Sequence, residues 1–151
     1  MCHAAGVSVE AKLGAVGGDE GGALYGHADE SLFTDPQLAR DFVDRTGIDA
    51  LAVAIGNAHG KYRGEPKLDF LRLDAIRQQA AIPLVLHGGS GISDADFRRA
   101  IELGIHKINF YTGMSQAALA AVEARMAHRQ PMYDEVAELL LAVEAAISDT
   151  V

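Results

Sequence analysis

The sequence predicts an α/β fold in which four strand-and-helix units form about half of an eightfold barrel. Short apolar runs alternate with amphipathic stretches along the 151 residues. The two middle runs are almost continuously apolar, as in strands that are covered on both faces. The spacing of strand, helix and strand is typical of parallel pairing through crossovers. Four such units in about 110 residues make half of a barrel that usually takes roughly 250 residues.

Four apolar runs are expected to form the strands of this half-barrel. They lie at residues 7–13, 49–55, 83–86 and 106–110. The sequence contains no linker, repeat or low-complexity segment between them. One domain over residues 1–151 is therefore expected.

The first helix has clear start and stop signals. Thr34 is expected to be its N-cap, with Pro36 in the first turn, and the helix is expected to run to Thr46 before the C-cap Gly47. Four further helices are expected. They lie at residues 68–80, at 94–103 between Ser93 and Gly104, and at 115–126 and 134–147 on either side of Pro131.

Charge and composition disfavour several classes of function. The formal net charge is −8, which argues against an electrostatic binder of nucleic acid or membranes. No apolar run approaches the roughly 20 residues of a membrane span, and the start lacks the pattern of a signal peptide. The single cysteine, Cys2, cannot form an internal disulfide. A cytoplasmic protein with neither a nucleic-acid nor a membrane partner is expected.

Polar, glycine-rich segments follow all four expected strands. They lie at residues 17–22, 56–61, 87–91 and 109–112. The carboxyl ends of barrel strands are where active sites are built. The chemistry of the chain is therefore expected at this end of the sheet.

Two histidines follow the second and third strands, His59 and His87. Neighbouring strands lie about 4.8 Å apart, so two imidazoles there could share one zinc ion at nitrogen–zinc distances of about 2 Å. The alternative is that each histidine only caps its strand through a hydrogen bond. Both interpretations are open from the residues alone.

A glycine-rich turn precedes the third of the expected helices. Gly88, Gly89 and Ser90 lead toward its N-terminus, where backbone N–H groups and the helix dipole favour an anion. Barrel phosphate sites often use the last two strand-to-helix loops, which makes Thr112 a second phosphate contact. The alternative is a plain glycine turn.

Other charged and aromatic residues give weaker signals. Lys61 could neutralise phosphate charge, whereas Arg63 and Lys67 fit a solvated loop. Glu20, on a glycine-rich loop, could transfer a proton or could simply be solvated. The tyrosines are interpreted as packing residues. They are Tyr25, Tyr62, Tyr111 and Tyr133.

Three motifs together resemble the class II, zinc-dependent ketose-bisphosphate aldolases, which include fructose- and tagatose-1,6-bisphosphate aldolases. The motifs are Gly-Asn-Ala-His-Gly at 56–60, Leu-His-Gly-Gly-Ser-Gly at 86–91 and the run 100–109. The resemblance implies the last four β/α units of a TIM (β/α)8 barrel plus C-terminal helices. It also implies zinc-dependent, reversible aldol cleavage of a ketose 1,6-bisphosphate to dihydroxyacetone phosphate and glyceraldehyde 3-phosphate.

The resemblance also assigns roles to individual residues. His59 and His87 would be zinc ligands, and Glu20 would match a loop acid that transfers a proton. The remaining residues would hold the substrate or a monovalent cation at its phosphate. They are Gly60, Gly88 and Ser90 for phosphate or cation, Asn109 for the dihydroxyacetone phosphate portion and Thr112 for its phosphate.

The departures from the family pattern concern catalysis. The family's first half supplies an aspartate for proton transfer and a histidine as third zinc ligand, and this chain has no such Asp-His pair. Lys12 stands where the family has a further glutamate, and Glu10 does not restore that alignment. A catalytic zinc usually has three protein ligands. The isolated chain is therefore expected to be inactive or incomplete, with its missing half or a second copy as partner.

Two other functions are compatible with the sequence. One is a non-catalytic half-barrel remnant that binds phosphate or metal and dimerises through its open sheet edges. The other is a phosphate-binding barrel enzyme that uses no metal.

Overall fold

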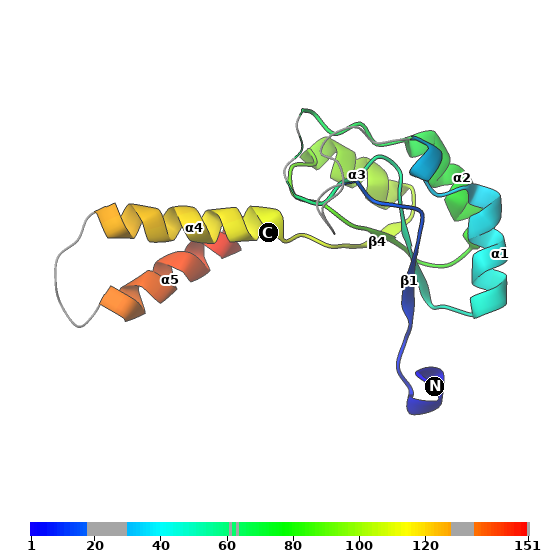
Figure 1. Cartoon of the computed structure of the whole chain (residues 1–151), viewed down its shortest axis with the longest axis horizontal. Coiled ribbons are helices and arrows are strands. Elements are labelled where there is room, and N and C mark those ends of the chain that lie inside the picture. The colour runs from blue at the N-terminus through cyan, green and yellow to red at the C-terminus, as the bar shows by residue number, and fades with distance from the viewer. Residues whose placement is uncertain (18–29, 61, 63, 128–134, 151) are drawn as a thin grey trace. The chain divides into compact units, whose positions relative to one another are not determined.

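The computed structural model describes residues 1–17, 30–60, 62, 64–127 and 135–150 (Figure 1). The chain forms two compact units, Met1–Asn109 and Phe110–Val151. The first unit contains the sheet and its helices, and the second contains a pair of helices. Among the described helices, none is long and apolar enough to cross a membrane.

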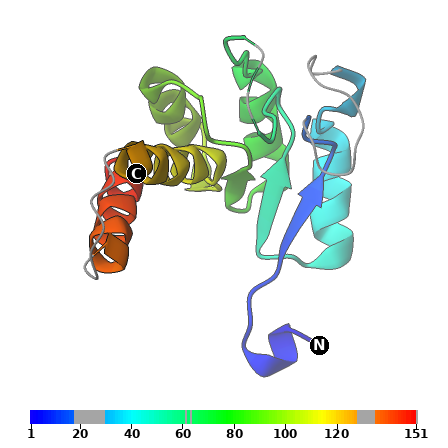
Figure 2. The same ribbon diagram turned by 60° about the vertical axis from the view of Figure 1, so that its left-hand side comes forward.

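The first unit holds four parallel strands in the order β1-β2-β3-β4 (Figure 2). The strands are β1 Glu10–Leu13, β2 Ala50–Val53, β3 Leu84–Leu86 and β4 Ile105–Ile108. The first three lie within the apolar runs that predicted them, and β4 overlaps its run but begins one residue earlier. The helices between them confirm the α/β class and the crossovers expected from the spacing.

Among its described residues, the first unit also contains three α-helices and two short 3₁₀ helices. The α-helices are α1 Pro36–Thr46, α2 Phe70–Ala80 and α3 Asp94–Glu102, and the 3₁₀ helices are η1 His3–Ala5 and η2 Glu30–Leu32. Helix α2 begins two residues later than expected, because Asp69 caps it by accepting a hydrogen bond from the Arg72 amide. Ser93 caps α3 as predicted.

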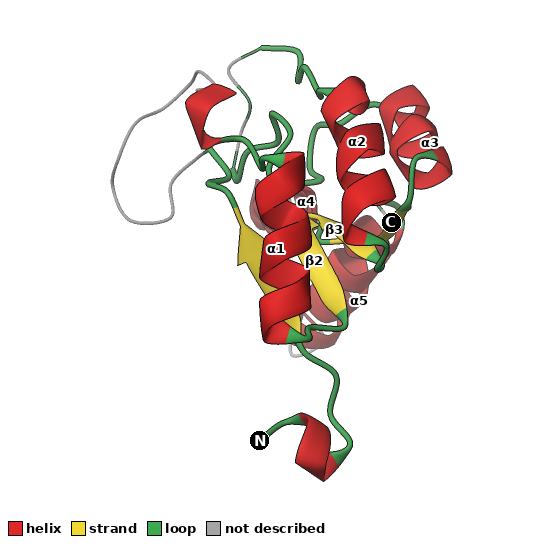
Figure 3. Ribbon diagram, turned by 90° about the vertical axis from the view of Figure 1, so that its right-hand side faces the viewer, coloured by secondary structure: helices red, strands yellow, loops and turns green. Residues whose placement is uncertain are grey.

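The core lies between the helices and one face of the sheet (Figure 3). Leu51, Val53 and Leu84 of the strands are fully buried, as are Leu73 and Ile76 of α2. The alternation of a strand's side chains places Ala11 and Leu13 toward this core, while Glu10 and Lys12 are exposed. On the face of the sheet away from the helices, Glu10 and Lys12 of β1 and Lys107 of β4 flank the buried Ala52 and Val85 of the middle strands.

The N-cap of α1 is Asp35 rather than the expected Thr34. The Asp35 carboxylate accepts hydrogen bonds from the amides of Gln37 and Leu38 at 2.8 and 3.0 Å. Thr34 is buried, and its hydroxyl donates to the Leu13 carbonyl and accepts from the Ala54 amide. The prediction was wrong because two capping residues stand side by side and one of them is needed to join β1 to β2. Gly47 is the C-cap as predicted, with φ at 62°.

Replacing Thr34 with valine is expected to lower the free energy of unfolding by about 1–3 kcal/mol, because it leaves the buried Ala54 amide and the Leu13 carbonyl unpaired. Thr46→Val is the matched control, since Thr46 is exposed and its hydroxyl donates to the Phe42 carbonyl of the same helix. The measurement is urea denaturation of both variants. Equal losses would contradict the bridging role of Thr34.

A second link lies at the other end of these strands. The Asp49 carboxylate accepts from the Val9 amide at 2.6 Å and lies 2.8 Å from Nε2 of His3. The Val9 hydrogen bond, followed by the one from His3, lowers the pKa of Asp49 below its usual value of 3.8. Asp49 therefore links the segment before β1 to the start of β2.

Asp49→Asn is expected to destabilise the chain at neutral pH but not in acid. A lowered folded-state pKa gives stability that is present above the unfolded value and is lost as the pH falls through the folded one. The difference in urea midpoint between wild type and variant should therefore shrink as the pH falls below 3.8. A difference that grows in acid would contradict this sign.

The described helices of the second unit are α4 Thr112–Ala127 and α5 Glu135–Ser148. The two helices pack against each other, and Arg125 of α4 pairs with Glu138 of α5. Helix α4 starts three residues earlier than expected, and Pro131 lies outside the described residues.

Candidate active site at the carboxyl ends of the strands

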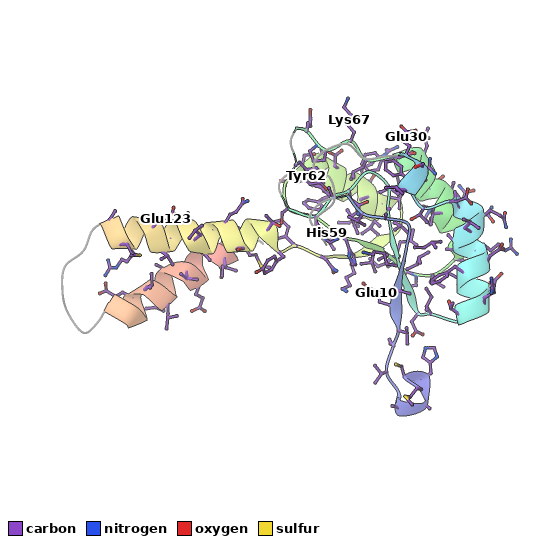
Figure 4. All side chains as sticks on the ribbon, viewed as in Figure 1. Glu10, Glu30, His59, Tyr62, Lys67 and Glu123 are labelled. Atoms are coloured by element: carbon purple, nitrogen blue, oxygen red, sulfur yellow. The ribbon has the colours of Figure 1, made fainter. Side chains whose placement is uncertain are left out.

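The loops after β1 and β2 stay paired beyond the ends of the strands. Gly17 forms a parallel bridge with Ala58, and the His59 amide donates to the Gly17 carbonyl at 2.6 Å. His59 and Tyr62 lie on the loop that follows β2 (Figure 4). The backbone at His59 is therefore anchored to the loop that follows the neighbouring strand β1.

The structure places His59 and His87 side by side. Their ring centroids are 5.7 Å apart and their planes are inclined by 80°. His59 is half-buried with a buried Nε2, and the side chain of His87 is 18% exposed. Two imidazoles bound to one zinc at about 2.1 Å would have their centroids roughly 5 Å apart. The separation of the two rings is therefore close to the one that a shared ion requires.

These two histidines could supply two of the ligands of a metal site, but they do not make a complete site. A catalytic zinc usually takes three protein ligands. Among the residues that the structure describes, no group of three or more His, Cys, Asp and Glu side chains could hold a metal ion. A third ligand would have to come from outside this set.

Glu10 joins this site from the face of the sheet away from the helices, a role that sequence reasoning missed. Its two carboxylate oxygens lie 3.2 Å from Nε2 of His87 and 2.6 Å from Nζ of Lys107. Burial raises the pKa of Glu10, but the hydrogen bonds from Lys107 and His87 outweigh it and lower the pKa below 4.5. The ion pair connects the two edge strands, β1 and β4, so the sheet curves around this face.

The glycine loop after β3 is tightly packed. Gly88 has a φ of +66°, and a Cβ there would lie 2.0 Å from the Ala58 carbonyl oxygen. The Gly89 amide donates to the Asn109 carbonyl at 3.0 Å, and the Asn109 amide donates to Leu86. Ser90 is buried. The loop then leads into the N-terminus of α3, as the phosphate prediction requires.

The other predicted site residues lie next to His59, in the second unit or outside the described residues. Gly60 is half-buried with a φ of +84° and open space where a Cβ would be. Thr112 is the first residue of α4, in the second unit. Lys67 is exposed, as expected for a solvated loop. Glu20, Lys61 and Arg63 lie outside the described residues.

Two further polar side chains connect the loops after β2 and β3. The Asn57 amide group donates to the His87 carbonyl at 3.0 Å and accepts from the Ile55 amide. The Tyr62 hydroxyl accepts from the Ala58 amide and donates to the Gly88 carbonyl. Burial raises the pKa of Tyr62. For Tyr62, the sequence offered one hint of this role, a tyrosine in a polar loop. A buried tyrosine hydroxyl usually finds a hydrogen-bond partner.

Comparison with known proteins gives a consistent result. The family model "Fructose-bisphosphate aldolase class-II" matches residues 1–151. The YdjI aldolase from Escherichia coli K12 is 44% identical, with a TM-score of 0.75 over 97% of this chain and 49% of its own. The chain spans about half the length of this solved relative.

Two other solved structures agree. A Coccidioides immitis protein, named as a fructose-1,6-bisphosphate aldolase by inference, is 29% identical, with a TM-score of 0.78 over 99% of this chain and 52% of its own. Fructose-bisphosphate aldolase from Campylobacter jejuni is 26% identical, with a TM-score of 0.71 over 99% of this chain and 51% of its own. These matches confirm the predicted partial barrel.

Proposed function

Because the chain belongs to the class II fructose-bisphosphate aldolase family, we propose that it supplies the second half of an aldolase barrel. The reaction would be the zinc-dependent, reversible cleavage of a ketose 1,6-bisphosphate to dihydroxyacetone phosphate and glyceraldehyde 3-phosphate. The observation that carries the proposal is the pair of histidines, 5.7 Å apart, beside a tight glycine loop. We place it in the cytoplasm as one domain over residues 1–151.

His59 and His87 are the proposed zinc ligands. Bound there, zinc would polarise the substrate carbonyl and stabilise the negative charge that cleavage leaves on its oxygen. Glu10 accepts from His87 and restricts that ring, as carboxylates beside metal-binding histidines commonly do. The third ligand and the aspartate for proton transfer would come from the other half of the barrel.

The glycine loop is the proposed phosphate site. Gly88, Gly89 and Ser90 stand before the N-terminus of α3, where amides and the helix dipole favour an anion. Asn109 is held beside this loop by the hydrogen bond from Gly89. A monovalent cation is proposed to lie at the same phosphate. The remaining proposed contacts are Gly60, Lys61 and Thr112, with Glu20 as the residue that transfers a proton.

A second candidate is a non-catalytic half-barrel that binds phosphate or metal and dimerises. It is favoured by the two edge strands, β1 and β4, which have no further strand partner in the described part of the chain. Sedimentation analysis separates the two candidates. A zinc-binding homodimer that remains inert when the missing barrel half is supplied would support the remnant.

Calorimetric titration with dihydroxyacetone phosphate tests the main proposal. Binding should be strong only after one equivalent of zinc has been added, and inorganic phosphate should compete with it. The same affinity with and without zinc would overturn the zinc assignment and favour a metal-free phosphate site. No binding in either state would count against both.

A further inference from the structure

The backbone on one side of each histidine is held by a single oxygen atom. Ala58, which precedes His59, donates its amide hydrogen to the Tyr62 hydroxyl at 2.9 Å. The same hydroxyl donates to the carbonyl of Gly88, which follows His87, at 3.0 Å. Tyr62 therefore connects the two histidine-bearing loops at positions next to both rings.

The surroundings of Tyr62 restrict where this oxygen can lie. The tyrosine is partly buried, and a Cβ added at Gly91 would lie 3.2 Å from its ring. Its hydroxyl accepts one hydrogen bond and donates another, so the polar group is satisfied at this partly buried position. The ring, held against Gly91, carries the hydroxyl into the gap between the two loops.

Asn57 also links the loops after β2 and β3. Asn57 is 2% exposed, and its side chain bridges the Ile55 amide at the end of β2 and the His87 carbonyl. Residues 87 and 88 thus each receive one hydrogen bond from the loop after β2. A cross-link of this kind at adjacent positions fixes the separation of the loops as well as their direction.

We propose that Tyr62 is a positioning residue that sets the spacing of His59 and His87 through its hydroxyl group. The inference deepens the proposed function, because the spacing matters if both rings bind one zinc ion. A metal site binds its ion well only when its ligands are held to within about 0.5 Å of the required geometry. Groups outside the ligand set that orient metal-binding histidines typically contribute 10–100-fold in affinity.

Tyr62→Phe tests the proposal by removing only the hydroxyl oxygen. We expect zinc affinity, measured by competition with a chromophoric chelator, to fall about 10–100-fold while circular dichroism shows a folded chain. Tyr111→Phe is the matched control, since Tyr111 is 74% exposed and lies in the second unit. Unchanged zinc affinity in Tyr62→Phe would overturn the proposal.

A second measurement needs no metal and separates this inference from the zinc assignment. In the metal-free chain, the ring resonances of His59 and His87 should both shift in Tyr62→Phe, while His106, which contacts the Gly104 carbonyl, should not. If the wild type binds no zinc but Tyr62→Phe shows these shifts, the zinc assignment is contradicted and the positioning role is supported. Unaltered resonances of both rings would contradict the positioning role by itself.

Discussion

Gly88→Ala is expected to destabilise the first unit by about 2–5 kcal/mol, a large part of the roughly 5–15 kcal/mol that holds a typical domain together. The added Cβ would lie 2.0 Å from the Ala58 carbonyl oxygen and 3.3 Å from the His59 amide nitrogen. Overpacking of this kind costs about 1–3 kcal/mol or more, and the left-handed φ of +66° adds about 1–2 kcal/mol.

The clash cannot be relieved by a side-chain rotation, because the obstructing atom belongs to the backbone. The loop after β2 would have to move, and His59 would move with it. Gly60→Ala is the matched control. Its φ is +84°, but an added Cβ would meet no atom within 4 Å, so only the conformational cost of about 1–2 kcal/mol applies. Thermal and urea unfolding of both variants measure the difference, and equal losses would contradict the close contact of the two loops.

Replacing either His59 or His87 with alanine is expected to weaken zinc binding by about 100-fold or more. A catalytic zinc usually has three protein ligands. Removal of a ligand should lower zinc affinity more than removal of a residue that only orients a ligand, which typically costs 10–100-fold. Because the chain supplies two candidates, loss of either leaves a single imidazole. The two variants should therefore be similarly impaired.

His106→Ala is the control for these variants. His106 lies in the same sheet, is exposed and contacts the Gly104 carbonyl through Nδ1, so its loss should leave zinc affinity unchanged. Chelator competition at a temperature where all variants are folded gives the dissociation constants. A His59→Ala variant that binds zinc like the wild type would show that the two rings do not share an ion.

The course of the chain through the sheet could be predicted from local patterns. Apolar runs predicted the four strands because each strand needs apolar side chains on the face that the helices cover, and the two middle strands are buried on both faces. Gly47 and Ser93 identified helix ends because their roles depend on a few neighbouring amides. Thr34 was wrongly predicted to be the N-cap because its hydroxyl instead bonds to Leu13 and Ala54. These residues are 21 and 20 positions away in the sequence, so a local pattern does not reveal the contacts.

The composition of the candidate site was harder to predict than its location. His59 and His87 could be proposed because they stand at the ends of adjacent strands. Glu10 could not, because its contacts with His87 and Lys107 span 77 and 97 residues and depend on the curvature of the sheet. Tyr62 was interpreted as packing, and nothing in its sequence neighbourhood specifies that its hydroxyl bridges two loops.

The most direct test of the central claim is cleavage of fructose 1,6-bisphosphate by a reconstituted barrel. The chain would be mixed with a polypeptide comprising the first four β/α units of a class II aldolase, including its Asp-His pair, and triose phosphate release would be followed with and without zinc. We predict zinc-dependent cleavage that neither half shows alone and that His59→Ala with His87→Ala abolishes. A stable, zinc-loaded complex of the two halves that releases no triose phosphate would contradict the account.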